Sequence, residues 1–209
     1  MVAALALLPV AYLAGTFPTA HLVARSRGVD ITEEGSGNPG ASNVYRLMGR
    51  GPAALVFLGD VGKGALPAGV GLFVADHVGA YLLGVAAVVG HVYPVTRRFR
   101  GGRGVATAGG MAIVIYPLVC LGLIVVFFVV TRLTHKASLG SIVISVGLPL
   151  LVWATGAAED DWEVAALAAV SLLVIARHSA NLRRLVHGEE LRLDLEQGRP
   201  ARDDERGVA

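Results

Sequence analysis

Long apolar stretches alternate with short polar segments along most of the chain. The stretches cover residues 2–24, 51–75, 79–95, 105–130, 139–154 and 164–176. A helix needs about 20 apolar residues to cross the hydrocarbon core of a bilayer, and several of these stretches reach that length. The core of a soluble domain of this length could not bury so many apolar residues. The pattern therefore predicts an all-α, polytopic integral membrane protein.

Composition and charge agree with this class and suggest an orientation. Hydrophobic residues make up 54% of the chain and charged residues only 16%. Cations gather at residues 25–50, 97–103, 132–136 and from 177 onward, whereas the ends near residues 76 and 159–163 carry acids. Lys and Arg favour cytoplasmic loops. We therefore expect the N-terminus outside and the C-terminus in the cytoplasm.

The stretch 105–130 has basic residues on both flanks, so it must cross the membrane twice to keep these flanks on one side. We expect a short helix pair that breaks near Tyr116-Pro117, because proline interrupts helical hydrogen bonding. The total is about seven transmembrane helices. Residues 1–187 are expected to form one membrane domain, and residues 188–209 a charged, disordered cytoplasmic tail.

The loop at residues 35–43, Gly-Ser-Gly-Asn-Pro-Gly-Ala-Ser-Asn, has the composition of an oxyanion cradle. Its glycines allow backbone N–H groups to approach a ligand, and its polar side chains add neutral donors. An ordinary surface turn would use similar residues. The loop also matches G-x-G-x-x-G, but it follows a membrane segment and not the strand of a dinucleotide-binding unit. The candidate phosphate ligands are Ser36, Gly37, Asn38, Ser42, Asn43 and the nearby Arg46.

Further polar residues stand at the expected cytoplasmic ends of the other stretches. Asp60 and Lys63 lie one helical turn apart, which favours an ion pair for Asp60 and an anionic ligand for Lys63. Arg103 lies among glycines just before a helix, which is typical of a second anion site. His91 is either a ligand or a helix-end histidine bonded to a loop carbonyl.

The expected cytoplasmic ends of two more apolar stretches supply hydroxyl, imidazole and amide groups. Ser138 and Ser141 follow Lys136 at an expected helix start, where serine often caps N–H groups, and one hydroxyl could face a ligand. His178 and Asn181 are three residues apart on one helical face, so they can act together.

Taken in order, these motifs resemble the bacterial acyl-phosphate:glycerol-3-phosphate acyltransferases. The matching residues are 35–43 with Arg46, Asp60-x-x-Lys63-Gly64, Gly90-His91-x-Tyr93-Pro94, 101–107, and His178-x-x-Asn181-x-x-Arg184-Leu185. Arg103 stands where the family commonly has lysine, which keeps the charge but changes the hydrogen-bond geometry. The motifs extend over nearly the whole membrane region.

The resemblance implies transfer of a fatty acyl group from acyl phosphate to the sn-1 hydroxyl of glycerol 3-phosphate, which yields lysophosphatidic acid and inorganic phosphate. It implies that Ser36, Gly37, Asn38, Ser42 and Asn43 hold the acyl phosphate, together with Ser141, His178 and Asn181. Arg46, Lys63 and Arg103 would anchor glycerol 3-phosphate, and His91 joins the substrate-binding set. The expected catalytic residues are Ser36, Asn43, His178 and Asn181.

The implied setting is the bacterial plasma membrane, with the site at its cytoplasmic face. The expected partners are the two substrates, membrane lipids and the enzyme that forms acyl phosphate; no nucleic acid, cofactor or catalytic metal is expected. A phosphate or organophosphate transporter is the alternative, because intramembrane charges and broken helices also mark permeation sites. A transporter predicts functional residues near mid-bilayer, whereas the motifs here gather at one face.

Overall fold

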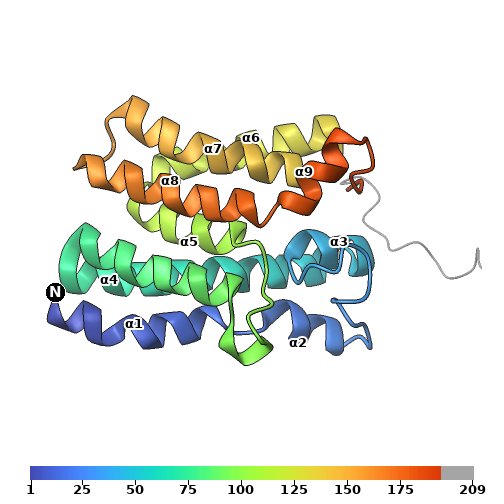
Figure 1. Ribbon diagram of the computed structural model, residues 1–209, viewed down its shortest axis with the longest axis horizontal. Coiled ribbons are helices and arrows are strands. Elements are labelled where there is room, and N and C mark those ends of the chain that lie inside the picture. Colours follow the sequence, from blue (N-terminus) through green and yellow to red (C-terminus); the bar gives the residue numbers. More distant parts are fainter. Residues whose placement is uncertain (194–209) are drawn as a thin grey trace, which may run out of the picture.

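The computed structural model describes residues 1–193, and all of its regular elements are helices. Figure 1 shows them lying nearly side by side along the long axis. The helices are α1 (Val2–Gly15), α2 (Thr19–Arg25), α3 (Ala41–Met48), α4 (Arg50–Val92), the 3₁₀ turn η1 (Val95–Arg97), α5 (Val105–Ile115), α6 (Pro117–Thr134), α7 (Ala137–Thr155), α8 (Asp161–Ala176) and α9 (Ser179–Val186).

The helix α4 contains two arms that fold back on each other. Its backbone leaves the helical region at Ala75 and Asp76, and Asp76 has a φ of 50°. A Cβ added to Gly71 would lie 2.1 Å from the carbonyl oxygen of Gly79, so the arms touch beside the break. This break separates the two predicted apolar stretches 51–75 and 79–95.

Small residues allow the helices around α4 to pack at backbone contact. A Cβ on Gly15 of α1 would lie 2.1 Å from the carbonyl oxygen of Ala87, and one on Gly64 would lie 1.9 Å from that of Thr107 in α5. Only glycine permits such close approach. The helices α1, α4 and α5 therefore form one closely packed layer, and α6 to α8 form a second (Figure 1).

The pair predicted in residues 105–130 is present, with its break at the expected place. The helix α5 ends at Ile115, Tyr116 caps it, and α6 begins at Pro117. Pro117 is compatible with the first position of a helix because no intrahelical bond needs its missing N–H.

Within residues 1–193, four helical segments are long and apolar enough to cross a membrane, or five if α8 and α9, bent by 62°, form one span. The chain is thus an all-helical, polytopic membrane protein. The total of about seven crossings and the orientation remain predictions.

The first stretch differs from the single helix expected over residues 2–24. It is interrupted at 16–18, between α1 and α2, where Pro18 lacks an N–H group. The break exposes two carbonyl oxygens to side chains from elsewhere in the chain. That of Thr16 accepts from Arg97 Nη2 at 2.8 Å, and that of Phe17 accepts from Lys63 Nζ at 2.7 Å.

The beginning of the predicted tail is packed against the bundle. Glu190 and Leu193 are both 5% exposed, and the Leu193 N–H donates to the carbonyl oxygen of His135 at 2.7 Å. The rest of the predicted disordered tail lies outside the described residues.

Candidate active site

The loop before α3 is held by a single buried amide. The Oδ1 atom of Asn43 accepts from the Ser36 N–H at 2.8 Å, while its Nδ2 donates to the carbonyl oxygens of Glu34, at 3.0 Å, and Ile31, at 3.4 Å. Asn43 is 1% exposed. Its side chain therefore shapes the loop, and its polar atoms are already engaged with the backbone.

The loop turns through two left-handed glycines, Gly35 (φ 62°) and Gly37 (φ 66°). Between them, the buried Oγ atom of Ser36 has no hydrogen-bond partner in the described part of the chain. A buried polar atom left without a partner calls for an explanation such as a ligand. Among the described residues, no side chain caps the start of α3, so the N–H groups of Ala41 and Ser42 remain available beside the half-buried Gly37 and Asn38.

The short helix α9 contributes a second buried group. His178 is 1% exposed, and its Nδ1 must donate to the carbonyl oxygen of Val174, 2.8 Å away, which leaves Nε2 as the acceptor nitrogen. Asn181 is 2% exposed, and its Nδ2 donates to Glu190 Oε1 at 2.7 Å. Its Oδ1 has no partner within residues 1–193.

Glu190 accepts from three side chains that lie on two helices, α7 and α9. Besides Asn181, Ser138 Oγ at the start of α7 donates to Oε1 at 2.9 Å, and Arg184 Nε donates to Oε2 at 3.0 Å. The Nη2 atom of Arg184 has no partner among the described residues. We call Ser138, Asn181, Arg184 and Glu190, with the adjoining Arg46 and Arg103, the Glu190 cluster.

Two arginines bring excess positive charge to this cluster. Burial lowers the pKa of Arg103 to about 10, and the neighbouring carboxylate of Glu190 partly opposes that shift, so the side chain stays protonated at neutral pH. Burial also lowers the pKa of Arg46. The Arg46 guanidinium donates to the carbonyl oxygens of Arg192, at 2.9 Å, and Leu191, at 3.2 Å. Such a surplus of guanidinium groups suits a phosphate ligand.

The glycine-rich loop that carries Arg103 rests directly on His91. The Gly102 N–H donates to the His91 carbonyl oxygen at 3.1 Å, and a Cβ on Gly102 would lie 2.2 Å from His91 Nε2. Arg177 fixes the loop from the end of α8 by donating to the Gly101 carbonyl oxygen at 3.2 Å. His91, 7% exposed, thus lies beneath this loop.

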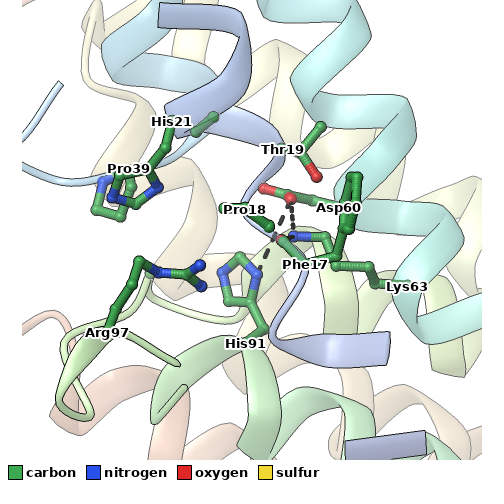
Figure 2. A pocket seen from close by; sticks show the side chains of 11 residues that line it. Phe17, Pro18, Thr19, His21, Pro39, Asp60, Lys63, His91 and Arg97 are labelled. Atoms are coloured by element: carbon green, nitrogen blue, oxygen red, sulfur yellow. Dashed lines mark hydrogen bonds and ion pairs between the residues drawn. The ribbon is translucent and has the colours of Figure 1, made fainter. Parts of the chain in front are cut away.

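A separate polar group lies where α1, α2 and α4 meet. Lys63 Nζ is 2.6 Å from Asp60 Oδ1, which confirms the expected ion pair, and His91 Nδ1 is 3.9 Å from the same oxygen. We call Asp60, Lys63, His91 and Arg97 the Asp60 cluster. Figure 2 shows them around a small pocket, with His21 and Pro39 across it from Asp60 and Lys63.

The structure thus divides the expected site residues outside the Ser36 loop mainly between the two clusters. Lys63 and His91 belong to the Asp60 cluster, and Asn181, Arg46 and Arg103 to the Glu190 cluster. His178 lies close enough to Arg103 and Glu190 to interact with both electrostatically. Ser141 lies on α7, one turn after Ser138, and its hydroxyl donates to the Ala137 carbonyl oxygen at 2.9 Å.

Sequence reasoning missed Glu190, which it assigned to the solvated tail. Its surroundings in the sequence are charged, and nothing local distinguishes it from Glu189, which is exposed. One weak signal was present in the sequence. Glu190 is the second carboxylate after the His178–Asn181 motif, and a buried Asn181 amide needs an acceptor for its N–H groups.

Known proteins share both the sequence and the arrangement of these elements. The family model described as glycerol-3-phosphate acyltransferase matches residues 5–188. This chain belongs to the glycerol-3-phosphate acyltransferase family. A relative from Exiguobacterium sibiricum is 38% identical over 93% of this chain and 96% of its own length. Another, from Geobacter sulfurreducens, is 41% identical over 90% of this chain and 96% of its own length. Both are named glycerol-3-phosphate acyltransferase.

Two crystal structures of PlsY, an integral membrane glycerol 3-phosphate acyltransferase, share the fold of this family member. One is the glycerol 3-phosphate form and the other the lysophosphatidic acid form. They superimpose with TM-scores of 0.87 and 0.85 at 34% identity, and each comparison covers 92% of this chain and 96% of the other. The family resemblance drawn from the motifs is therefore confirmed, and this chain is a glycerol-3-phosphate acyltransferase.

Proposed function

We propose that this enzyme uses acyl phosphate as its donor and transfers the acyl group to the sn-1 hydroxyl of glycerol 3-phosphate, releasing lysophosphatidic acid and inorganic phosphate. The observation that carries this proposal is the position of α3. Its Asn43 shapes the Ser36 loop, and one turn later its Arg46 reaches the backbone beside Glu190. One short helix thus supports two sets of oxyanion donors, as a reaction between two phosphate-bearing substrates requires.

The Ser36 loop is the proposed site for the phosphoryl group of the donor. The Ser36 hydroxyl and the start of α3, which no side chain of the described residues bonds or caps, supply neutral donors, with Gly37, Asn38 and Ser42 around them. Asn43 acts here as a positioning residue, because its amide is bonded to the loop backbone. Asn181 and Ser141 contribute from α9 and α7.

Arg46 and Arg103 are the proposed anchors for the phosphate of glycerol 3-phosphate. Guanidinium groups bind phosphate through paired, charge-assisted hydrogen bonds. Lys63 acts more indirectly in this account: its ammonium group contacts Asp60 and the Phe17 carbonyl oxygen, so it supports the fold beside the site.

The proposed chemistry needs no covalent enzyme intermediate, because an acyl phosphate is already activated. The acceptor oxygen forms a bond to the acyl carbonyl carbon, and the bond from that carbon to the phosphate oxygen breaks. The proton of the hydroxyl passes to the departing phosphate, while His178 aligns the acceptor through Nε2. Alignment and stabilisation of charge on the leaving group then supply the rate enhancement.

The proposed location is the bacterial plasma membrane, with the reaction at its cytoplasmic face. The arginines of both clusters lie at the end of the bundle that carries the basic loops, which is the end expected inside by the distribution of cations. At that face the enzyme could receive its substrate directly from the enzyme that forms acyl phosphate.

The test supplies purified protein in detergent with labelled glycerol 3-phosphate and either palmitoyl phosphate or palmitoyl-CoA. We expect lysophosphatidic acid with the phosphate donor only. Product with palmitoyl-CoA alone would contradict the proposed donor. Uptake of glycerol 3-phosphate by proteoliposomes, with no product from either donor, would favour a transporter instead.

A further inference from the structure

A third buried polar group lies at the opposite end of the bundle, where three interruptions of the helices meet. His77 follows the break in α4, Tyr116 separates α5 from α6, and Glu163 lies in the first turn of α8. Glu163 is 1% exposed. None of these residues takes part in the proposed reaction.

The contacts in this group hold one carboxylate and one imidazole in fixed positions. His77 Nδ1 lies 3.0 Å from Glu163 Oε1, and the Tyr116 hydroxyl donates to Glu163 Oε2. Tyr81 extends the network, since its hydroxyl lies 2.9 Å from that of Tyr116. The tyrosines thus orient the Glu163 carboxylate through Oε2, and its Oε1 atom faces the His77 ring.

A second carboxylate approaches the ring from the solvent side. Glu159 Oε1 lies 3.6 Å from His77 Nε2, and the Glu159 side chain is 69% exposed. One ligand atom from each of His77, Glu159 and Glu163 can be chosen so that all lie within 4.8 Å of one another. Donor atoms about 2.0–2.1 Å from a four-coordinate Zn²⁺ lie roughly 3.3–3.4 Å from one another, so the side chains must close by up to about 1.5 Å when the ion binds.

The charge of the group also calls for a cation. Residues 64–96, 104–131 and 137–176 contain no lysine or arginine. The described helices around the group therefore supply no permanent positive charge to the buried Glu163 carboxylate, and His77 is its ionisable neighbour. A buried carboxylate without a compensating cation is costly.

We propose that His77, Glu159 and Glu163 bind a divalent transition-metal ion of the Zn²⁺ class. An imidazole with carboxylates is a donor set that suits Zn²⁺, and water would complete the coordination. The ion would enter from the solvent side, where Glu159 is exposed, and the Glu159 carboxylate would then bind it. The hydrogen bond from the Tyr116 hydroxyl would orient the Glu163 ligand. The site would clamp the α4 turn to the start of α8, far from the Glu190 cluster.

The test measures Zn²⁺ binding to the full chain, freed of any affinity tag and treated with a chelator, by competition with a chromophoric chelator. We expect one ion per chain, with Kd raised at least about tenfold by Glu159→Gln and by His77→Asn, since each removes a ligand. Glu159→Gln alters an exposed side chain, so folding is not at risk. Co²⁺ added to the wild type should give the visible absorption of a tetrahedral site.

The matched control is the double variant His187→Asn/Glu189→Gln, which removes an exposed imidazole and an exposed carboxylate from the other end of the bundle. It should bind Zn²⁺ as the wild type does. Wild-type affinity in both Glu159→Gln and His77→Asn, or no saturable binding to the wild type, would overturn the proposal and leave a purely structural hydrogen-bond network. Acyl transfer is not required for either readout, so this test is independent of the proposed reaction.

Discussion

The Glu190 and Asp60 clusters both adjoin the glycine-rich loop, yet they differ in how far carboxylates balance their cations. In the Asp60 cluster, Lys63 contacts a carboxylate and a backbone carbonyl oxygen, and Arg97 donates to another carbonyl oxygen. In the Glu190 cluster, three arginines adjoin one carboxylate. Both clusters keep unpartnered buried atoms among the described residues: Arg97 Nε in the Asp60 cluster, and Asn181 Oδ1 and Arg184 Nη2 in the Glu190 cluster. An unpartnered polar atom therefore does not by itself identify a binding site, whereas a surplus of guanidinium groups over carboxylates points to an anionic ligand.

This difference predicts that the two clusters fail in different ways when mutated. Changes in the Ser36 loop and the Glu190 cluster should reduce catalysis in a folded protein. Changes in the Asp60 cluster should first reduce stability.

The largest expected effect is on turnover in Ser36→Ala. Within residues 1–193 the Ser36 hydroxyl has no hydrogen-bond partner, so its removal breaks no bond seen there, while it takes a donor from the proposed leaving phosphate. We expect kcat to fall by about 10²–10³, the usual cost of losing one preorganised donor. Steady-state rates with palmitoyl phosphate give the comparison. Ser26→Ala, which alters an exposed serine bonded to Val23, is the control and should keep wild-type kcat.

Asp60→Asn should act mainly on stability. It leaves the ammonium group of Lys63, which is 9% exposed, without its charged partner. Breaking such a buried pair costs about 3 kcal/mol, which lowers Tm by roughly 6–12 °C in a chain of this length. Thermal unfolding in detergent measures the shift. The double variant Asp60→Asn/Lys63→Met should recover much of the loss; a wild-type Tm in Asp60→Asn would show that the ion pair is dispensable.

Gly102→Ala should disturb substrate binding more than folding. The new Cβ would meet His91 Nε2 at 2.2 Å, so the loop that carries Arg103 must shift. We expect the KM for glycerol 3-phosphate to rise about tenfold, the loss of roughly one charge-assisted hydrogen bond. The matched control is Gly109→Ala, because a Cβ there would meet nothing within 4 Å. An equal rise in both variants would exclude a specific role for the loop.

The smallest expected effect concerns pH. Burial lowers the pKa of Arg103 to about 10, so its charge is fully present below about pH 9 and is lost only as the pH rises through 10. The KM for glycerol 3-phosphate should therefore stay constant between pH 7.5 and 9. A steady rise over that range would implicate a group of lower pKa in binding.

Much of the helical architecture could be predicted because it depends on local features. The apolar stretches correspond to helices, the break at Tyr116-Pro117 follows from proline, and the spacing of Asp60 and Lys63 favours the ion pair that the structure contains. Helical periodicity and proline act over a few neighbouring residues, so a single sequence displays them.

The contacts between distant segments could not be predicted in the same way. Glu190 accepts from Ser138, and His77 contacts Glu163, across long sequence separations that only helix packing brings together. The break between α1 and α2 is visible as Pro18, but its use by the side chains of Lys63 and Arg97 depends on where α4 and η1 lie.

The most direct test of the account compares the KM for glycerol 3-phosphate in Arg103→Met and Arg97→Met, one arginine from each cluster. The account predicts at least about a tenfold rise for Arg103→Met, because a phosphate anchor is lost, and less than about threefold for Arg97→Met, whose guanidinium bonds the Thr16 carbonyl oxygen. A larger rise in Arg97→Met than in Arg103→Met would place the substrate phosphate in the Asp60 cluster and contradict the account.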